Sequence, residues 1–284
     1  MSDRMIHRYR LREKLAIYAG MALFLVFLLA PFVEAFMVSL RPLPEIFRIP
    51  YRFITDDMSF DNYRRIWTSQ PMLWRWILNS FGIAVGVTAL SMACSVPAAY
   101  AFARFRFRFR DSLLAMFLGV SMVGAAVLII PLYKLMLALG LLNTYAALII
   151  PGAAFTVPTG IFLMRSYFLR IPRELEEAAW VDGASRLYTL RRVILPIATP
   201  GMVVVAITTF IAAYAQQFLF ALTFNSRGEL NPLPVGLYQF FGHQEVRWNE
   251  LMAASLVGIL PVMLIYVFLQ RYIVAGLTAG AVKE

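Results

Sequence analysis

Six long runs of this chain contain no charged residue, and each is long enough to cross a membrane as a helix. A spanning helix needs about 20 predominantly apolar residues. The uncharged runs are 15–33, 76–103, 112–133, 135–164, 193–226 and 251–270. We therefore expect an all-α integral membrane protein with six transmembrane helices. The helices are predicted near residues 15–40, 76–102, 112–132, 144–165, 200–224 and 250–271.

The composition agrees with a membrane protein rather than a soluble one. Hydrophobic residues make up 61% of the chain and charged residues 15%, whereas a typical soluble domain has about 25% charged residues. The first uncharged run is also longer than the roughly 7–15 apolar residues of a signal peptide. We therefore expect it to remain as a membrane anchor.

The distribution of lysine and arginine predicts the orientation of the chain. Basic residues concentrate in the loops that face the cytoplasm. With the N-terminus inside, the cytoplasmic segments hold seventeen basic residues and the outer segments nine. Both termini are then cytoplasmic, as segments 1–14 and 273–284, and flank a single transmembrane domain over 15–272. The net charge of +10 is explained by this topology, so no nucleic acid is expected as a partner.

The charged loop over residues 166–199 predicts a helix, a tight bend and a second helix. Pro172 suits a first helical turn, and the glutamates that follow it lie near the positive end of that helix. Gly183 interrupts the helix, and Ser185 is a suitable cap for the next one. From these residues alone, the loop is either an ordinary interfacial hairpin or a docking surface for another protein.

The spacing of residues in this loop resembles the EAA loop of ABC-importer permeases. The matching positions are Glu177-Ala178-Ala179, Gly183 and Leu195-Pro196, with Val193 in place of the family's isoleucine. The resemblance implies a type I ABC-importer permease fold in the bacterial cytoplasmic (inner) membrane. It also implies a coupling helix that transmits work from a separate ATPase. The implied coupling residues are Glu177, Ala178, Ala179, Asp182, Gly183, Leu195 and Pro196.

Three further stretches resemble the carbohydrate-uptake branch of these permeases, in particular the MalG-like subunit of maltose-type transporters. They are residues 99–108, 233–242 and 269–284. The resemblance implies a sugar importer in membrane lipid, with a second homologous permease and two ATP-binding-cassette ATPase subunits. It also implies a periplasmic or lipid-anchored sugar-binding protein. The family's C-terminal tail extends between the ATPases, which implies this role for Gly276, Leu277, Thr278, Ala279 and Gly280.

The sequence contains no sign of a catalytic or cofactor site of its own. None of its three lysines follows a glycine, so a P-loop Gly-Lys pair is absent. ATP and Mg²⁺ are therefore expected on the partner ATPases. Cys94 is the single cysteine and the two histidines are far apart, so no metal site is expected.

Polar residues within the uncharged runs are candidates for the solute path, because polar groups are costly in lipid. Many relatives carry Trp-Asn-Glu in the fifth span, and this chain has Ala215 and two glutamines there. The neutral amides donate and accept hydrogen bonds, which suits a hydroxyl-rich solute. The possible path residues are Gln216, Gln217 and Asn79.

Three other functions compete with a sugar permease. A permease for a non-carbohydrate solute, such as a polyamine or phosphate, would share the EAA loop, but the carbohydrate-type C-terminus argues against it. A secondary transporter would need charged relay residues at mid-membrane, and the available Glu34 lies near a helix end. A membrane enzyme would need a cluster of reactive side chains at one membrane face, which the sequence lacks.

Overall fold

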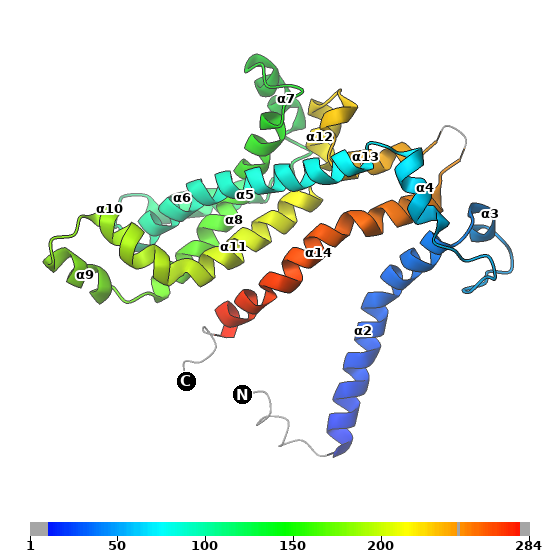
Figure 1. The fold of residues 1–284 in the computed structure, drawn as a ribbon. Coiled ribbons are helices and arrows are strands. Elements are labelled where there is room, and N and C mark those ends of the chain that lie inside the picture. The colour runs from blue at the N-terminus through cyan, green and yellow to red at the C-terminus, as the bar shows by residue number, and fades with distance from the viewer. Residues whose placement is uncertain (1–10, 243–244, 279–284) are drawn as a thin grey trace. The chain divides into compact units, whose positions relative to one another are not determined.

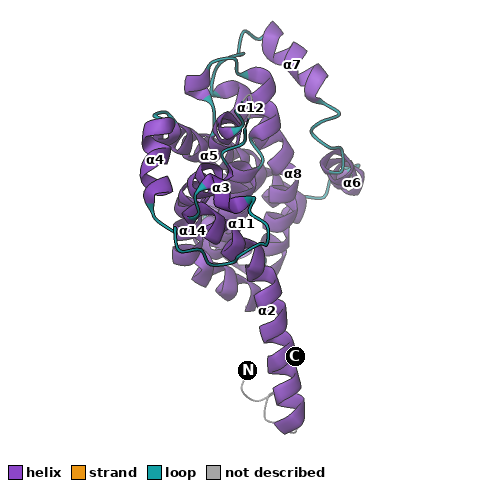
Figure 2. Cartoon of the chain, turned by 90° about the vertical axis from the view of Figure 1, so that its right-hand side faces the viewer, coloured by secondary structure: helices purple, strands orange, loops and turns teal. Residues whose placement is uncertain are grey.

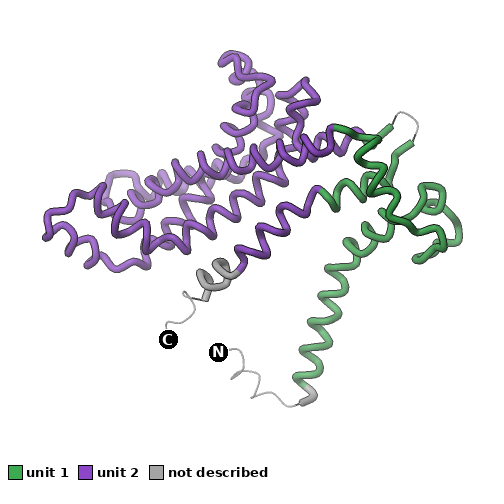
Figure 3. The backbone as a smooth tube through the Cα atoms, in the orientation of Figure 1, with its two compact units in different colours: residues 1–71, 240–257 green, residues 72–239, 258–284 purple. Residues whose placement is uncertain are grey.

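The structure is a computed structural model that describes residues 11–242 and 245–278, and this part consists of helices joined by loops (Figure 2). The chain forms two compact units (Figure 3). The first comprises the residues up to Pro71 together with Phe240–Val257, and the second comprises Met72–Gln239 together with the residues from Gly258 onward.

The first unit contains three N-terminal helices and the beginning of the last helix. They are α2 (Leu11–Leu40), α3 (Leu43–Ile46), α4 (Asp61–Ser69) and the first part of α14 (Trp248–Thr278). The side chain of Asn62 in α4 joins these elements. Its Nδ2 donates to the carbonyl oxygens of Ser39 at 2.8 Å and Arg41 at 3.0 Å, and its Oδ1 accepts from Nδ2 of Asn249 at 3.0 Å. These bonds hold α4 against the ends of α2 and α14.

The second unit is built on three long helices that run side by side in Figure 1, namely α5, α8 and α11. The helices of this unit are α5 (Leu73–Arg104), α6 (Arg110–Ser121), α7 (Ile129–Ala138), α8 (Ala146–Arg170), α9 (Glu174–Val181), α10 (Arg186–Thr189), α11 (Leu195–Ala215), α12 (Phe218–Phe224), α13 (Leu233–Leu237) and the part of α14 that follows Val257. The shorter turns are η1 (Leu190–Ile194), η2 (Gly228–Leu230) and η3 (Tyr238–Phe240).

Small residues let α5 and α8 approach each other closely. A Cβ placed on Gly160 of α8 would lie 2.8 Å from Oγ of Ser95, and one on Gly152 would lie 2.9 Å from Cγ2 of Val87. Close approach through small side chains is a common way to pack membrane helices, since burial from water contributes little within lipid. Helices α5 and α8 therefore form a tightly packed frame to which the loops attach.

Five helices of the described residues are long and apolar enough to cross a membrane: Glu13–Leu40, Leu73–Arg104, Ala146–Arg170, Arg186–Ala215 and Trp248–Gln270. The continuous helix expected at 112–132 is interrupted, because α6 ends at Ser121 and α7 begins at Ile129. Gly124, a poor helix former, lies in this interruption. The count of six spanning helices therefore stays a prediction.

The prediction of a single helix at 200–224 is also wrong, because the helix is interrupted between α11 and α12 at Gln216 and Gln217. The buried side chain of Gln217 bonds to a backbone carbonyl of α5 rather than lying along a continuous helix. Hydropathy does not report such a break, because both sides of it are apolar.

Candidate functional site

The charged loop forms a pair of short helices at one end of the second unit's long helices (Figure 1). Between α9 and α10, Gly183 has φ of +84°, a left-handed conformation that glycine adopts without strain. The N–H of Ala184 donates to the carbonyl of Ala179 at 2.9 Å, as in a Schellman helix end. Oγ of Ser185 accepts from the N–H of Tyr188 at 3.3 Å and caps α10. The structure thus contains the predicted helix, bend and helix.

Helix α9 turns one side chain inward and exposes most of the others. Glu176 is the residue of this helix that is buried, with 2% of its surface exposed. Glu177 and Ala178 are exposed and Ala179 is half-buried. Val181, at the end of the helix, is 88% exposed. The outward face of α9 therefore combines small and apolar side chains with Glu177.

The buried carboxylate of Glu176 is held by two side chains from the end of α5. Nε of Arg104 lies 2.5 Å from Oε1, and the hydroxyl of Tyr100 donates to Oε2 at 3.0 Å. Nη2 of Arg104 also donates to the carbonyl of Ile171 at 2.8 Å. Both charged side chains are at most 5% exposed. Removing one partner of such a buried pair typically costs about 3–5 kcal/mol, because the other charge is left unpaired.

Arg186 connects the second helix of the loop to the same region. Its guanidinium lies over the ring of Phe105 at 5.4 Å and over the ring of Trp180 at 5.5 Å. Such cation–π contacts are worth about 0.5–2 kcal/mol each. Together with Arg104 and Glu176 these residues line a hollow of about 220 Å³. The hollow brings together the end of α5, helix α9 and the start of α10.

The remaining motif residues do not line this hollow. Asp182 is exposed in the bend, while Leu195 is half-buried and Pro196 exposed at the start of α11. Pro196 lacks the N–H that would bond the carbonyl of Arg192 in a regular helix. The π-helical turn η1 ends two residues before it, and such turns occur where a helix absorbs a local irregularity.

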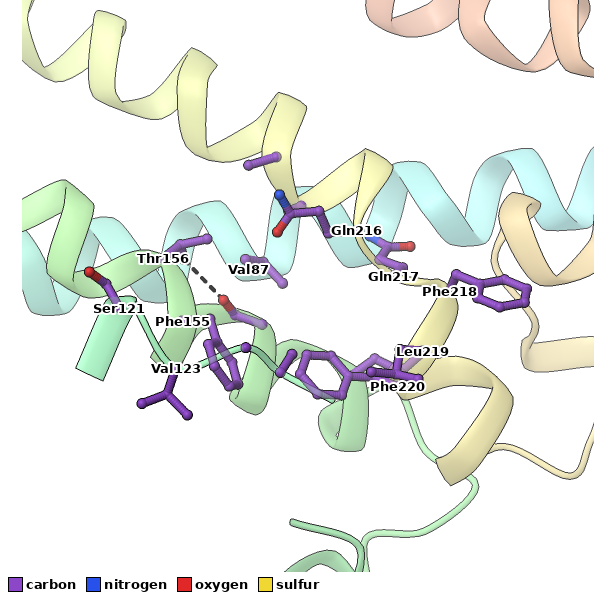
Figure 4. Close-up of a pocket in the computed structure, with 16 residues that line it drawn as sticks. Val87, Ser121, Val123, Phe155, Thr156, Gln216, Gln217, Phe218, Leu219 and Phe220 are labelled. Atoms are coloured by element: carbon purple, nitrogen blue, oxygen red, sulfur yellow. Dashed lines mark hydrogen bonds between the residues drawn. The ribbon is translucent and has the colours of Figure 1, made fainter. Parts of the chain in front are cut away.

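A second candidate site is a pocket of about 470 Å³ next to the break between α11 and α12 (Figure 4). Gln216 lines it together with Thr156 and Phe155 of α8. Phe220 of α12 also lines it and pairs with Phe155, with ring centroids 5.7 Å apart. Oγ1 of Thr156 donates to the carbonyl of Gly152 at 3.1 Å. Among the residues that the structure describes, the lining of this pocket is uncharged.

The two predicted glutamines have different environments. Both line the pocket, and Gln216 is exposed. Gln217 is 6% exposed, and its Nε2 donates to the carbonyl of Ser80 at 3.4 Å. Gln217 therefore also serves as a packing group between α12 and α5.

Asn79 is engaged by the loop that follows α12. Its Nδ2 donates to the carbonyls of Glu229 at 2.8 Å and Asn231 at 2.9 Å, and its Oδ1 accepts from the hydroxyl of Tyr145 at 2.8 Å. Oγ of the neighbouring Ser80 accepts from the N–H of Leu233 at 2.8 Å. This geometry gives Asn79 a tethering role, and its part in a solute path stays a prediction.

The predicted tail is only partly described. Helix α14 continues through Gly276, Leu277 and Thr278, while Ala279 and Gly280 lie outside the described residues.

Sequence reasoning missed three groups of residues. The first is the Arg104–Glu176 pair with Tyr100; Glu176 lies more than seventy positions from the other two, so no local pattern connects them. The second is the exposed Val181, which could have been found from the sequence as an apolar residue in a charged loop. The aromatic wall of the pocket was also missed, because Phe155 and Phe220 are ordinary residues of apolar runs.

The chain belongs to the family described as the binding-protein-dependent transport system inner membrane component, whose model matches residues 57–279. It is thus the transmembrane component of an ABC import system, which confirms the family inferred from the EAA loop.

Two relatives align with nearly the whole chain. The inner membrane ABC transporter permease protein YcjP of Escherichia coli (strain K12) is 36% identical over 277 residues, which cover 96% of this chain and 98% of the relative. The trehalose/maltose transport system permease protein MalG of Thermococcus litoralis is 36% identical over 279 residues, which cover 97% and 99%. Both are named as permeases, which agrees with a transport subunit rather than an ATPase.

A solved structure supports the fold. A crystal structure of a bacterial ABC transporter involved in the import of the acidic polysaccharide alginate contains a chain with a TM-score of 0.76 and 25% identity. The match covers 93% of this chain and 98% of that one. The predicted helical permease fold is therefore confirmed.

Proposed function

We propose that this chain is one membrane-spanning half of an ATP-driven importer that receives a sugar from a binding protein. The observation that carries the choice of sugar is the 36% identity, over 97% of the chain, to a permease named for trehalose and maltose. In the proposed complex a second homologous permease completes the path. Two ATP-binding-cassette subunits bind ATP and Mg²⁺, and a periplasmic or lipid-anchored protein delivers the sugar.

The chemistry of the pocket beside α12 supports a neutral, hydroxyl-rich solute. Aromatic faces such as Phe155 and Phe220 suit the apolar C–H faces of a sugar ring, while Gln216 and Thr156 offer hydrogen-bonding groups. An uncharged lining avoids a strong attraction for ions, which favours a neutral sugar over a polyamine or phosphate. We assign this pocket to the wall of the translocation path.

The outward face of the α9–α10 hairpin supports docking of an ATPase. Val181, Leu187 and Tyr188 expose most of their surface in a loop that is otherwise charged. Exposed apolar side chains rimmed by charges are typical of a protein interface. Glu177, Ala178 and Ala179 lie on the same helix, and the small alanines allow close approach. We assign this face to the cytoplasm, with both termini on the same side.

Reconstituted transport tests the proposed function. The binding protein would first be screened with carbohydrates for an increase in melting temperature. The whole complex in proteoliposomes is then expected to accumulate the sugar found in this way, and only when ATP and the loaded binding protein are both present. A binding protein that binds polyamine or phosphate but no carbohydrate would contradict the choice of solute. Uptake driven by an ion gradient without ATP would contradict the class of transporter.

A further inference from the structure

Helix α9 buries one side chain within the second unit, and this side chain is charged. Glu176 is the buried residue of this helix, and its carboxylate bonds to Arg104 and Tyr100 of α5. A helix that only rested on a membrane surface would bury apolar side chains instead. The attachment of α9 is therefore polar and specific.

The geometry of Arg104 makes this attachment resistant to sliding. Its Nε bonds to Glu176 within α9, and its Nη2 bonds to the carbonyl of Ile171 just before α9. A planar guanidinium that holds two acceptors fixes their direction as well as their distance. Apolar contacts have no such directionality, because burial is insensitive to orientation. A displacement of α9 thus acts on the end of α5, whereas at an apolar contact the two helices could slide past each other.

The other end of this connection reaches the pocket. Arg104 is the last residue of α5, and Val87 in the middle of the same helix lines the pocket beside α12. Helix α5 packs closely along α8, whose Phe155 and Thr156 also line the pocket. One continuous helix, with Pro97 inside it, therefore connects the buried ion pair with the pocket wall.

We propose that Arg104 and Glu176 form the mechanical link of this permease, so that displacement of α9 by the ATPase moves α5 and the pocket wall. The inference rests on the proposed function. Arg104, Glu176 and Tyr100 are positioning residues in it, since they touch neither the solute nor ATP. Glu177, the exposed neighbour on α9, has the separate role of facing the ATPase.

The test measures how many ATP molecules the whole complex hydrolyses for each sugar imported into proteoliposomes. Glu176→Gln keeps the side-chain shape but removes the negative charge. Arg104→Lys keeps the positive charge but removes the planar guanidinium that bonds two acceptors. Both variants are expected to assemble with the ATPases and to hydrolyse ATP, while the ratio rises about fivefold or more, within the usual range of coupling between sites. A role limited to stability would lower the melting temperature and leave this ratio unchanged.

A double variant shows whether the two residues act through one link. Arg104→Lys combined with Glu176→Gln is expected to raise the ratio no further than the stronger single variant, because the same connection is already broken. Independent, additive effects would overturn the proposal. Asp111→Asn is the matched control. It removes an exposed partner of Arg110 at the start of α6 and is expected to leave the ratio unchanged.

Two further outcomes keep the inference separate from the proposed function. If the native complex shows no sugar-dependent ATP hydrolysis, the proposed function fails. If the native complex is coupled and the assembled variants are equally coupled, only the mechanical link fails. Should the charge variants not assemble, Tyr100→Phe removes a single hydrogen bond to Glu176 and is expected to raise the ratio about twofold. An unchanged ratio in that variant would then overturn the proposal.

Discussion

The close contact between α5 and α8 predicts a specific packing energy at Gly160. A Cβ at this position would lie 2.8 Å from Oγ and 2.9 Å from Cβ of Ser95, which is completely buried. Because the Cβ of Ser95 is fixed to the backbone, a rotamer change does not relieve this contact, and the helices must separate. Overpacking of this kind costs about 1–3 kcal/mol. Alanine recovers about 1 kcal/mol through its higher helix propensity, so Gly160→Ala is expected to destabilise by about 0–2 kcal/mol.

A double-mutant cycle isolates the packing term from the propensity term. Ser95→Gly removes the obstructing atoms, so Gly160→Ala in that background is expected to show the propensity gain alone. The interaction energy between the two sites should be about 1–3 kcal/mol. Thermal unfolding of the purified protein in detergent, followed by circular dichroism, would report it as a shift of about 2–4 °C per kcal/mol.

Gly82→Ala provides the control for this cycle. Gly82 lies on the same helix α5, and a Cβ there meets no atom within 4 Å. Because nothing opposes the gain in helix propensity, the control variant is expected to be about 1 kcal/mol more stable than the native protein. If Gly160→Ala and Ser95→Gly have additive effects, or if Gly160→Ala matches Gly82→Ala, the close approach of α5 and α8 is refuted.

Two further predictions concern the candidate sites. Gly183→Val should abolish sugar-stimulated ATP hydrolysis, because φ of +84° strains a β-branched residue. Gly183→Asn should retain most of this hydrolysis, and equal activities of the two variants would count against a role for the bend. Gln216→Leu should reduce the uptake rate without lowering the melting temperature, whereas Gln217→Leu should lower the melting temperature through loss of its bond to Ser80. Unchanged uptake in Gln216→Leu would remove this residue from the solute path.

The parts of the structure that sequence reasoning predicts well depend on short-range rules. The bend at Gly183 follows from the tolerance of glycine for positive φ, and the start of α10 follows from the capping hydroxyl of Ser185. Long apolar runs likewise predict long helices wherever the backbone continues without interruption.

The parts that it misses depend on contacts between distant residues. The break at Gln217 is accompanied by a bond to Ser80 on another helix, and Asn79 is used by a loop that begins about 150 positions later. The pairing of Arg104 with Glu176 likewise requires the fold to be known. Polar residues in apolar runs therefore indicated where special contacts occur, but not with which partner.

Labelling of a single cysteine at position 181 tests most directly the claim that an ATPase acts on the α9–α10 hairpin. Val181 is 88% exposed at the end of α9, and Cys94 is itself exposed, so Val181→Cys would be introduced together with Cys94→Ser. A membrane-impermeant maleimide is expected to leave this cysteine unlabelled in intact spheroplasts. It should label the cysteine in inside-out vesicles stripped of the ATPases, and added ATPase subunits should block the labelling. Labelling from the outer side, or no protection by the bound ATPases, would contradict the account.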